Sequence, residues 1–187
     1  MSNKPFSSKQ LINDEKLLEK MLNHFKSINW ESDTYIIHGN YVTPKRKTFM
    51  YGIKYSYSGI TKKPLPFDEK IKWIANQIEK TLGLEKNFFN GVLCNLYQDG
   101  DTHISYHTDD EKSLDKTAPI VSLCLGATRK FYLKDIETGV VTKLTHKNGE
   151  IITMFPPCQT KYKHSIPKEK KVKDVRISLT FRKFNNQ

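Results

Sequence analysis

The segment Arg176-Ile177-Ser178-Leu179-Thr180-Phe181-Arg182 alternates strictly between polar and apolar side chains. A period of two places the polar side chains on one face of an extended strand and the apolar side chains on the other. The segment Val92-Leu93-Cys94-Asn95-Leu96-Tyr97 also reads as a strand, with Asn95 and Tyr97 together on one face. Both segments predict β-strands that present polar groups on one side.

The arginines at the two ends of the first strand indicate an anion site. Arg carries a planar fork of N–H donors, so Arg176 and Arg182 on one strand face can bind the two carboxylates of a small diacid. An exposed strand with solvated charges is the better explanation of this pattern unless a metal site lies nearby. The choice between these interpretations therefore depends on whether the chain also supplies metal ligands.

The tripeptide His107-Thr108-Asp109 and the later His164 form a candidate metal site. Residues i and i+2 of an extended strand point to the same side, so the imidazole of His107 and the carboxylate of Asp109 can approach one ion. His164 would complete a set of two histidines and one carboxylate, the ligand set of non-haem iron(II) oxygenases. The alternative is a chance tripeptide and a surface histidine, because short motifs often arise by coincidence.

The cysteines favour iron over zinc at this site. Cys94, Cys124 and Cys158 form no C-x-x-C pair, and none has structural-zinc spacing to the histidines. An odd number of cysteines fits a reducing compartment better than a disulfide framework. We therefore expect free cysteines, with Cys94 and Cys124 as small core residues on strands.

Taken together, these motifs resemble the AlkB-type dioxygenases, which depend on iron(II) and 2-oxoglutarate. The resemblance runs from about Tyr51 to Phe184, in the family's order and with similar spacing. It is carried by Asn95-Leu-Tyr97, Gly100, His107-Thr-Asp109-Asp110-Glu111, Pro119 to Arg129, Met154, His164-Ser-Ile-Pro167 and Arg176 to Arg182. The resemblance implies a mainly β, α+β fold: a double-stranded β-helix (jelly-roll) core, N-terminal helices packed outside it and a nucleotide-recognition lid.

The resemblance also implies a role for each site residue. His107, Asp109 and His164 would hold iron(II) as the catalytic and metal-binding residues, and O2 would be the oxidant. Asn95 and Arg182 would lie near the chelating end of 2-oxoglutarate, and Tyr97 and Arg176 would hold its distal carboxylate. Ser178 stands where the family usually has Asn, so the distal carboxylate would lose one hydrogen bond or gain a water molecule.

The implied reaction is oxidative removal of alkyl groups from nucleobases such as 1-methyladenine and 3-methylcytosine, releasing aldehyde, succinate and CO2. The implied substrate contacts are a lid over the extruded base, two acidic residues that meet the cationic lesion, a finger inserted into the base stack, and basic groups toward the backbone. In that order they are Tyr55, Tyr57 and Ser58; Asp110 and Glu111; Ile37, His38 and Gly39; and Lys170 and Lys171. Arg129 is a further candidate substrate contact. In the finger, histidine stands where the duplex-acting branch has phenylalanine.

Composition supports a nucleic-acid partner. The formal net charge of +11 over 187 residues favours a polyanion or an anionic membrane surface. No apolar run approaches the roughly 18 residues of a membrane span, and the N-terminus lacks an apolar signal core. We therefore expect an intracellular, soluble monomer that works without a membrane, in the nucleus or wherever its DNA substrate resides. The resemblance to the duplex-acting branch implies duplex DNA as the favoured substrate, with single-stranded DNA or RNA as alternatives.

The order of predicted elements indicates one domain over residues 1–187. Residues 1–10 are polar and without periodicity, so we expect them to be flexible. An amphipathic helix is predicted from Asn13 to about Ile28, and a second from Pro66 to about Leu82, with Gly83 as its stop. Residues 33–65 are expected to form the lid, and residues 88–184 the catalytic jelly-roll, since short strands follow the helices.

Three other functions remain open. A nucleic-acid-binding jelly-roll that has lost catalysis would bind no iron, although the intact set of ligands and both arginines argue against it. An oxygenase of this fold that acts on protein or lipid would leave the basic surface unexplained. A purely structural domain gives no reason for the spacing of these polar residues.

Overall fold

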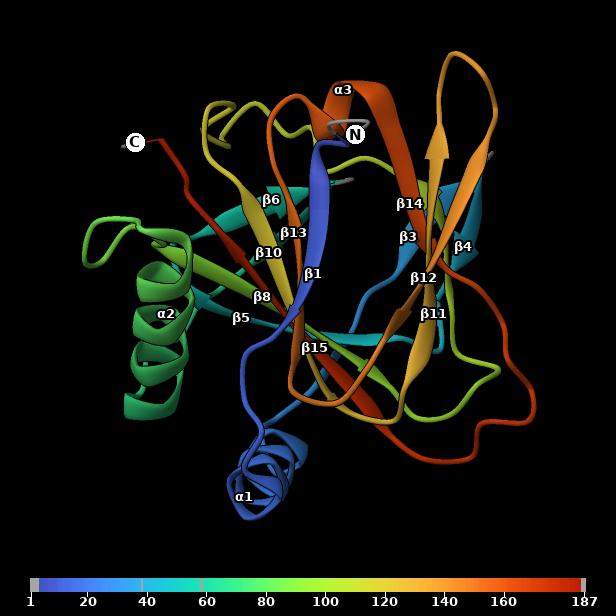
Figure 1. The fold of residues 1–187 in the computed structure, drawn as a ribbon. Coiled ribbons are helices and arrows are strands. Elements are labelled where there is room, and N and C mark those ends of the chain that lie inside the picture. Colours follow the sequence, from blue (N-terminus) through green and yellow to red (C-terminus); the bar gives the residue numbers. More distant parts are fainter. Residues whose placement is uncertain (1–3, 38, 58, 186–187) are drawn as a thin grey trace.

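The computed structural model describes residues 4–37, 39–57 and 59–185. Two antiparallel sheets lie face to face, and the two longer helices cover the outer side of the larger sheet (Figure 1). The larger sheet has the order β1 (Phe6–Gln10), β13 (Glu150–Met154), β10 (Ile120–Gly126), β15 (Arg176–Arg182), β8 (Gly91–Tyr97), β5 (Lys47–Gly52) and β2 (Glu31–Ser32). The smaller sheet has the order β12 (Val141–His146), β11 (Arg129–Asp135), β14 (Tyr162–Ile166) and β9 (Ile104–His107).

Helices α1 (Glu15–Lys26) and α2 (Glu69–Leu82) begin at capping aspartates. The Asp14 side chain accepts a hydrogen bond from the Leu17 amide, and the Asp68 side chain accepts one from the Ile71 amide. The predicted start of the second helix at Pro66 is therefore wrong by three residues, because Asp68 is the extended capping residue. Gly83 ends α2 in the left-handed region at φ 68°, as predicted.

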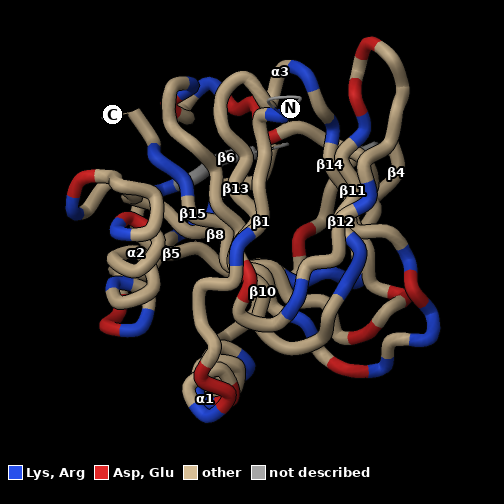
Figure 2. The backbone as a smooth tube through the Cα atoms, in the orientation of Figure 1, with Lys and Arg blue, Asp and Glu red and all other residues tan. Residues whose placement is uncertain are grey.

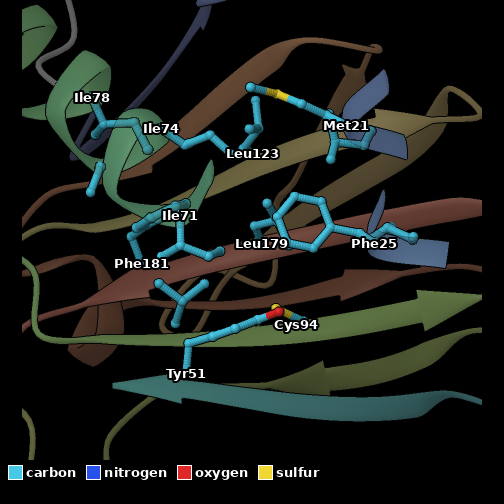
Figure 3. Close-up of a cluster of buried hydrophobic side chains, with 14 of the residues drawn as sticks. Met21, Phe25, Tyr51, Ile71, Ile74, Ile78, Cys94, Leu123, Leu179 and Phe181 are labelled. Carbon is cyan, nitrogen blue, oxygen red and sulfur yellow. The ribbon is translucent and has the colours of Figure 1, made fainter. Parts of the chain in front are cut away.

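The main hydrophobic core lies between these helices and the larger sheet. Figure 3 shows Met21 and Phe25 of α1 and Ile71 and Ile74 of α2 packed around Leu123, Leu179 and Phe181 of the sheet. The apolar face of β15 thus faces the helices, as the alternation of this segment predicts. Its polar face consequently points toward the smaller sheet, where a second cluster of buried residues lies between the two sheets.

Residues 6–10 form the paired strand β1, within the range 1–10 that the sequence predicted to be flexible. Phe6 to Gln10 pair with Met154 to Glu150 along five residue positions. The Phe6 ring also packs edge-on against Tyr162, with ring centroids 5.3 Å apart. Local sequence gave no sign of this strand, because its polar residues are held by backbone pairing to a segment about 140 positions away.

The predicted lid range of residues 33–65 contains two hairpins and one strand of the core. The hairpins are β3 (Tyr35–Ile37) with β4 (Asn40–Val42), and β6 (Tyr55–Tyr57) with β7 (Ile60–Lys62). Between them, β5 pairs with β8 and belongs to the larger sheet, although residues 47–52 fall within the range predicted for the lid. The consecutive buried residues Phe49, Met50 and Tyr51 explain why β5 lies inside the sheet.

The remaining helix, α3 (Cys158–Lys161), is a single turn before β14. Within the described residues, no helix is long and apolar enough to cross a membrane.

Candidate metal and co-substrate site

A cavity of about 590 Å³ opens between the two sheets. The polar faces of β8 and β15 form one wall, because the two strands pair antiparallel with Tyr97 opposite Arg176 and Asn95 opposite Ser178. Arg176 and Arg182 are 1% and 4% exposed, so the alternative of a solvated strand face is wrong. All five residues that we assigned to the co-substrate line this cavity: Asn95, Tyr97, Arg176, Ser178 and Arg182.

His107, Asp109 and His164 meet at the opposite wall. One ligand atom from each lies within 4.8 Å of the others. His107 ends β9 and pairs with His164 of β14, whereas Asp109 lies two residues beyond the end of β9. The backbone amide of Asp109 donates a 2.9 Å hydrogen bond to Oε1 of Gln159, which fixes the turn that carries the carboxylate.

The ring nitrogens of both histidines are oriented for metal binding. Nδ1 of His107 lies 2.9 Å from the Ser105 carbonyl, an acceptor, so Nδ1 carries the hydrogen and Nε2 keeps its lone pair. That Nε2 is 3.7 Å from Oδ1 of Asp109, and Nε2 of His164 is 4.0 Å from the same oxygen. The Phe131 ring stacks on His164 at 5.5 Å with an interplanar angle of 8° and holds its orientation.

Electrostatics keeps these groups in the protonation states that a metal needs. Burial alone would raise the pKa of Asp109, but the charge of Arg182 and the two nearby imidazoles hold that pKa well below its ordinary value. Burial, followed by the charge of His107, lowers the pKa of His164 to about 3. An ionised carboxylate and a neutral imidazole are donors that iron(II) prefers, so Asp109 and His164 fit that metal.

The two arginines of β15 have different partners. Nη2 of Arg182 donates a 2.6 Å hydrogen bond to Oδ2 of Asp109, which makes a buried ion pair at the metal end of the cavity. Arg176 has no carboxylate within 4.0 Å among the described residues, and its Nε and Nη1 are buried without a hydrogen-bond partner there. A buried cation without a counter-ion is costly, so this end of the cavity fits an anionic ligand.

A third arginine in the cavity was not predicted. Arg46 precedes β5, is 7% exposed, and its guanidinium donates hydrogen bonds to the side-chain oxygen of Asn95 and, over 3.4 Å, to the Tyr35 hydroxyl. Its neighbour Lys45 stays exposed and pairs with Asp101 at 2.5 Å. The basic run 45–47 gave no signal to distinguish these residues, because their burial depends on the path of the lid.

A buried ionic cluster joins the lid hairpins to this arginine. Lys62 of β7 is 3% exposed and pairs with Asp33 at 2.5 Å and with Glu31 at 2.7 Å. Asp33 also accepts hydrogen bonds from Thr48 and Tyr35. The contacts therefore continue from the second hairpin, through Asp33 and Tyr35, to Arg46 and the cavity wall.

Some of the predicted substrate contacts lie at the cavity, others are exposed away from it, and the side chains of the rest are not described. Glu111 lines the cavity, whereas Asp110 is exposed and is not among the described lining residues. Lys170 and Lys171 are exposed on the loop between β14 and β15. Gly39 is exposed at φ 79° in the turn of the first hairpin. His38 and Ser58 lie outside the described residues, and for Ile37, Tyr55 and Tyr57 the structure describes only the backbone of β3 and β6.

Arg129 is placed differently from its prediction as a substrate contact. It is 1% exposed and lies outside the described lining of the cavity. Its guanidinium donates to Glu169 at 3.1 Å and to the carbonyl oxygens of Asp99, Thr102 and Pro167 at 2.7–3.0 Å. All three guanidinium nitrogens are thus used to hold two loops together, which leaves Arg129 to anchor them.

Comparison with known proteins agrees with this geometry. Residues 3–182 match the family model of the 2OG-Fe(II) oxygenase superfamily. The DNA oxidative demethylase ALKBH2 of Mus musculus is 34% identical over 158 residues, which cover 79% of this chain and 65% of that protein. The alpha-ketoglutarate-dependent dioxygenase alkB homolog 3 of Homo sapiens is 33% identical over 168 residues, which cover 84% of this chain and 58% of that protein. The chain thus spans about three fifths of the length of the curated relatives it matches.

Solved structures agree on the fold. The structure of OsALKBH1 superposes with a TM-score of 0.70 at 16% identity, covering 98% of this chain and 100% of that one. A prolyl hydroxylase from Trichoplax adhaerens superposes with a TM-score of 0.65 at 11% identity, covering 97% of this chain and 84% of that one. At such low identity the likeness shows the fold alone, and it confirms the predicted jelly-roll.

Proposed function

The chain belongs to the 2OG-Fe(II) oxygenase superfamily, and from this premise we propose that it is an AlkB-type oxidative demethylase of alkylated nucleobases in DNA. Its substrates in this proposal are 1-methyladenine and 3-methylcytosine lesions, and its products are the restored base, an aldehyde, succinate and CO2. The similarity to ALKBH2 and to alkB homolog 3 supports the reaction class.

One observation carries the proposal. The two imidazoles and the carboxylate converge on one side of a cavity whose other wall holds Arg176, a buried cation without a carboxylate partner among the described residues. A metal-ligand set and an anion-binding group that face one cavity are what binding of iron(II) and a dicarboxylate co-substrate requires. Neither a structural domain nor a simple binding module explains both.

Each residue has a defined task in this proposal. His107, Asp109 and His164 hold iron(II), which when bound with 2-oxoglutarate activates O2 for oxidation of the alkyl group. Arg182 keeps Asp109 ionised and fixes the direction of its carboxylate. Arg176 receives the distal carboxylate beside the hydroxyl of Ser178, which itself lies 3.2 Å from the hydroxyl of Ser122.

The cavity also contains a group suited to a cationic base. Glu111 lines it on the side of the metal ligands, and 1-methyladenine and 3-methylcytosine carry a positive charge that a carboxylate stabilises. The lining residues Tyr106, Tyr35 and Phe131 supply aromatic surface in the same cavity. An extruded base binds between such surfaces by stacking.

Surface features support duplex DNA as the preferred polymer. Ile36 and Tyr41 are cross-strand partners in the first hairpin, and they are 69% and 80% exposed. An apolar and aromatic pair on a protruding hairpin is suited to contact bases in an opened stack. Figure 2 shows basic residues along the loop between β14 and β15, where Lys170 and Lys171 are exposed, on a chain of formal net charge +11. These lysines would bind the backbone of the second strand.

The test uses matched oligonucleotides: single-stranded DNA, duplex DNA and RNA of one sequence, each with a single 1-methyladenine. Protein is loaded anaerobically with iron(II) and 2-oxoglutarate and then exposed to air. We expect loss of one methyl group by mass spectrometry, dependent on both iron and 2-oxoglutarate and fastest on duplex DNA. The matched control is His107→Ala, which removes a partly exposed ligand and should abolish turnover without unfolding the protein.

Each other outcome identifies a different error. Faster turnover on RNA would mean that RNA, and not DNA, is the preferred substrate. Succinate release without demethylation of any oligonucleotide would mean an oxygenase with another target. If neither signal appears and iron does not bind, the chain is a binding module and the proposal is wrong.

A further inference from the structure

His146, the last residue of β12, lies directly against the guanidinium of Arg176. It is 0% exposed, and its Nδ1 is 3.0 Å from Nη2 of Arg176. Its Nε2 is 2.9 Å from the backbone carbonyl oxygen of Glu150, at the start of β13. The imidazole therefore connects the arginine to the backbone of the larger sheet, although it comes from the smaller one.

These two contacts determine the tautomer of His146. Arginine has donors and no acceptor, so Nδ1 must accept the hydrogen bond with its lone pair. A carbonyl oxygen is an acceptor, so Nε2 must carry the hydrogen that it donates to Glu150. Only the neutral imidazole with its hydrogen on Nε2 satisfies both partners. Burial, together with the charge of Arg176, lowers the pKa of His146 to about 3, which is consistent with this neutral form.

The contact restrains Arg176 without neutralising it. The Tyr97 ring lies 5.0 Å from the guanidinium carbon on another side, and the buried Cys124 thiol is a further neutral contact, so neutral groups alone hold the guanidinium. Nε and Nη1 remain without a partner among the described residues. A carboxylate in the place of His146 would have cancelled the charge, whereas a neutral acceptor orients the guanidinium and leaves its positive charge for a ligand.

We infer that His146 is a positioning residue for the co-substrate: it holds Arg176 in the orientation that binds the distal carboxylate of 2-oxoglutarate. The inference rests on the proposed function of this cavity. Because the arginine is fixed at one distance from the metal ligands, the same contact sets the chain length of the 2-oxo diacid that the site accepts. The five-carbon acid then binds better than its four-carbon and six-carbon analogues.

The test compares two polar variants, each of which retains one of the two hydrogen bonds. In His146→Asn, the side-chain oxygen lies near the position of Nδ1 and can still accept from Arg176, while the bond to Glu150 is lost. In His146→Gln, the longer amide lies near the position of Nε2 and can still donate to Glu150, while the bond to Arg176 is lost. Both variants keep a polar group in the buried site, and Arg176→Lys serves as the reference for a damaged anion site.

Two readouts separate positioning from folding. Calorimetric titration of the anaerobic iron(II) protein gives the Kd of 2-oxoglutarate, oxaloacetate and 2-oxoadipate, and turnover gives KM and kcat for 2-oxoglutarate. In His146→Gln we expect the Kd and KM for 2-oxoglutarate to rise about tenfold, with kcat nearly unchanged and weaker discrimination among the three acids. In His146→Asn we expect values within about threefold of the parent.

Equal behaviour of the two variants, or unchanged 2-oxoglutarate binding in His146→Gln, would overturn the inference. If Arg176→Lys still loses affinity in that case, the proposed function stands and only the role of His146 fails. If the parent protein does not bind 2-oxoglutarate, or if Arg176→Lys binds it as the parent does, the assignment of the cavity itself is wrong.

Discussion

Arg176 and Arg182 lie on one strand face, six residues apart, yet their replacement by Met should change stability in opposite directions. Arg176 is buried, and no carboxylate lies within 4.0 Å of it in the described part of the chain. Arg182 is buried in an ion pair with Asp109 at 2.6 Å. Met has a similar volume and no charge, so the comparison isolates the effect of a counter-ion on a buried cation.

The expected magnitudes follow from these contacts. Removing an uncompensated buried cation stabilises by about 1–4 kcal/mol. Loss of the hydrogen bond to His146 and of the Tyr97 contact offsets roughly 1–2 kcal/mol of that gain. From the middle values of these two ranges, Arg176→Met should raise the free energy of unfolding by about 1 kcal/mol. Arg182→Met leaves the carboxylate of Asp109 buried and should lower it by about 3–5 kcal/mol.

The assay is thermal and urea unfolding of the metal-free protein, because a bound metal would supply a second partner for Asp109. A chain of this size changes its Tm by about 2–4 °C per kcal/mol. The Tm should thus rise by about 2–4 °C in Arg176→Met and fall by about 6–20 °C in Arg182→Met. Arg176→Met should lose 2-oxoglutarate binding without a loss of stability. Similar destabilisation in both variants would refute the reasoning that Arg176 is a cation reserved for a ligand.

Three further predictions concern other parts of the molecule. The free energy of unfolding of the metal-free protein should fall as the pH decreases from about 6.5 toward 3. The reason is that His146 and His164 bind protons in the unfolded chain but stay neutral when buried in the fold. Each histidine should lower the free energy of unfolding by about 2 kcal/mol at pH 5. Urea unfolding at stepped pH should show that His146→Asn removes its share, and an unchanged slope would contradict this. Lys62→Met should lower the free energy of unfolding by about 3 kcal/mol, because the buried 2.5 Å ion pair between Lys62 and Asp33 is lost. Protease cleavage of the two hairpins should become faster, and unchanged cleavage would contradict this coupling. Gly100→Ala should weaken DNA binding, measured by fluorescence anisotropy, with no change in the Kd of 2-oxoglutarate. An added Cβ would lie 1.8 Å from the Glu169 carbonyl oxygen and would displace the loop between β14 and β15, which carries Lys170 and Lys171. Equal DNA affinity would show that this loop does not bind DNA.

Much of the site could be predicted because its signals are local. The alternation of Arg176 to Arg182 places both arginines on one face in any strand, and the spacing of His107 and Asp109 brings both groups to one side. The capping aspartates of α1 and α2 are also local signals. The start of α2 was still predicted three residues too early, because Pro66 was read as the first helical residue when Asp68 is the cap.

The errors occur where position depends on distant pairing. β1 is polar and becomes a strand only because β13 lies beside it. Arg129 has the sequence context of a surface strand, yet it points into the junction of two loops and is fully bound there. Arg46 resembles its two lysine neighbours in sequence, and only the path of the lid directs it to Asn95. None of these placements follows from residue type or spacing.

The opposite ends of β15 explain why the cavity needs one paired and one unpaired arginine. At the metal end, Asp109 must remain ionised and correctly oriented. Arg182 lowers the pKa of Asp109 and fixes its carboxylate by a hydrogen bond, and in this ion pair the carboxylate balances the charge of Arg182. At the other end, the proposed function places the distal carboxylate of the co-substrate beside Arg176. A carboxylate partner there would compete with it, so in this proposal orientation comes from a neutral group. His146 supplies a lone pair without a charge, and its burial keeps it neutral. The positive charge that remains at Arg176 therefore favours a dianionic 2-oxo acid, while the ion pair at Arg182 does not compete for it.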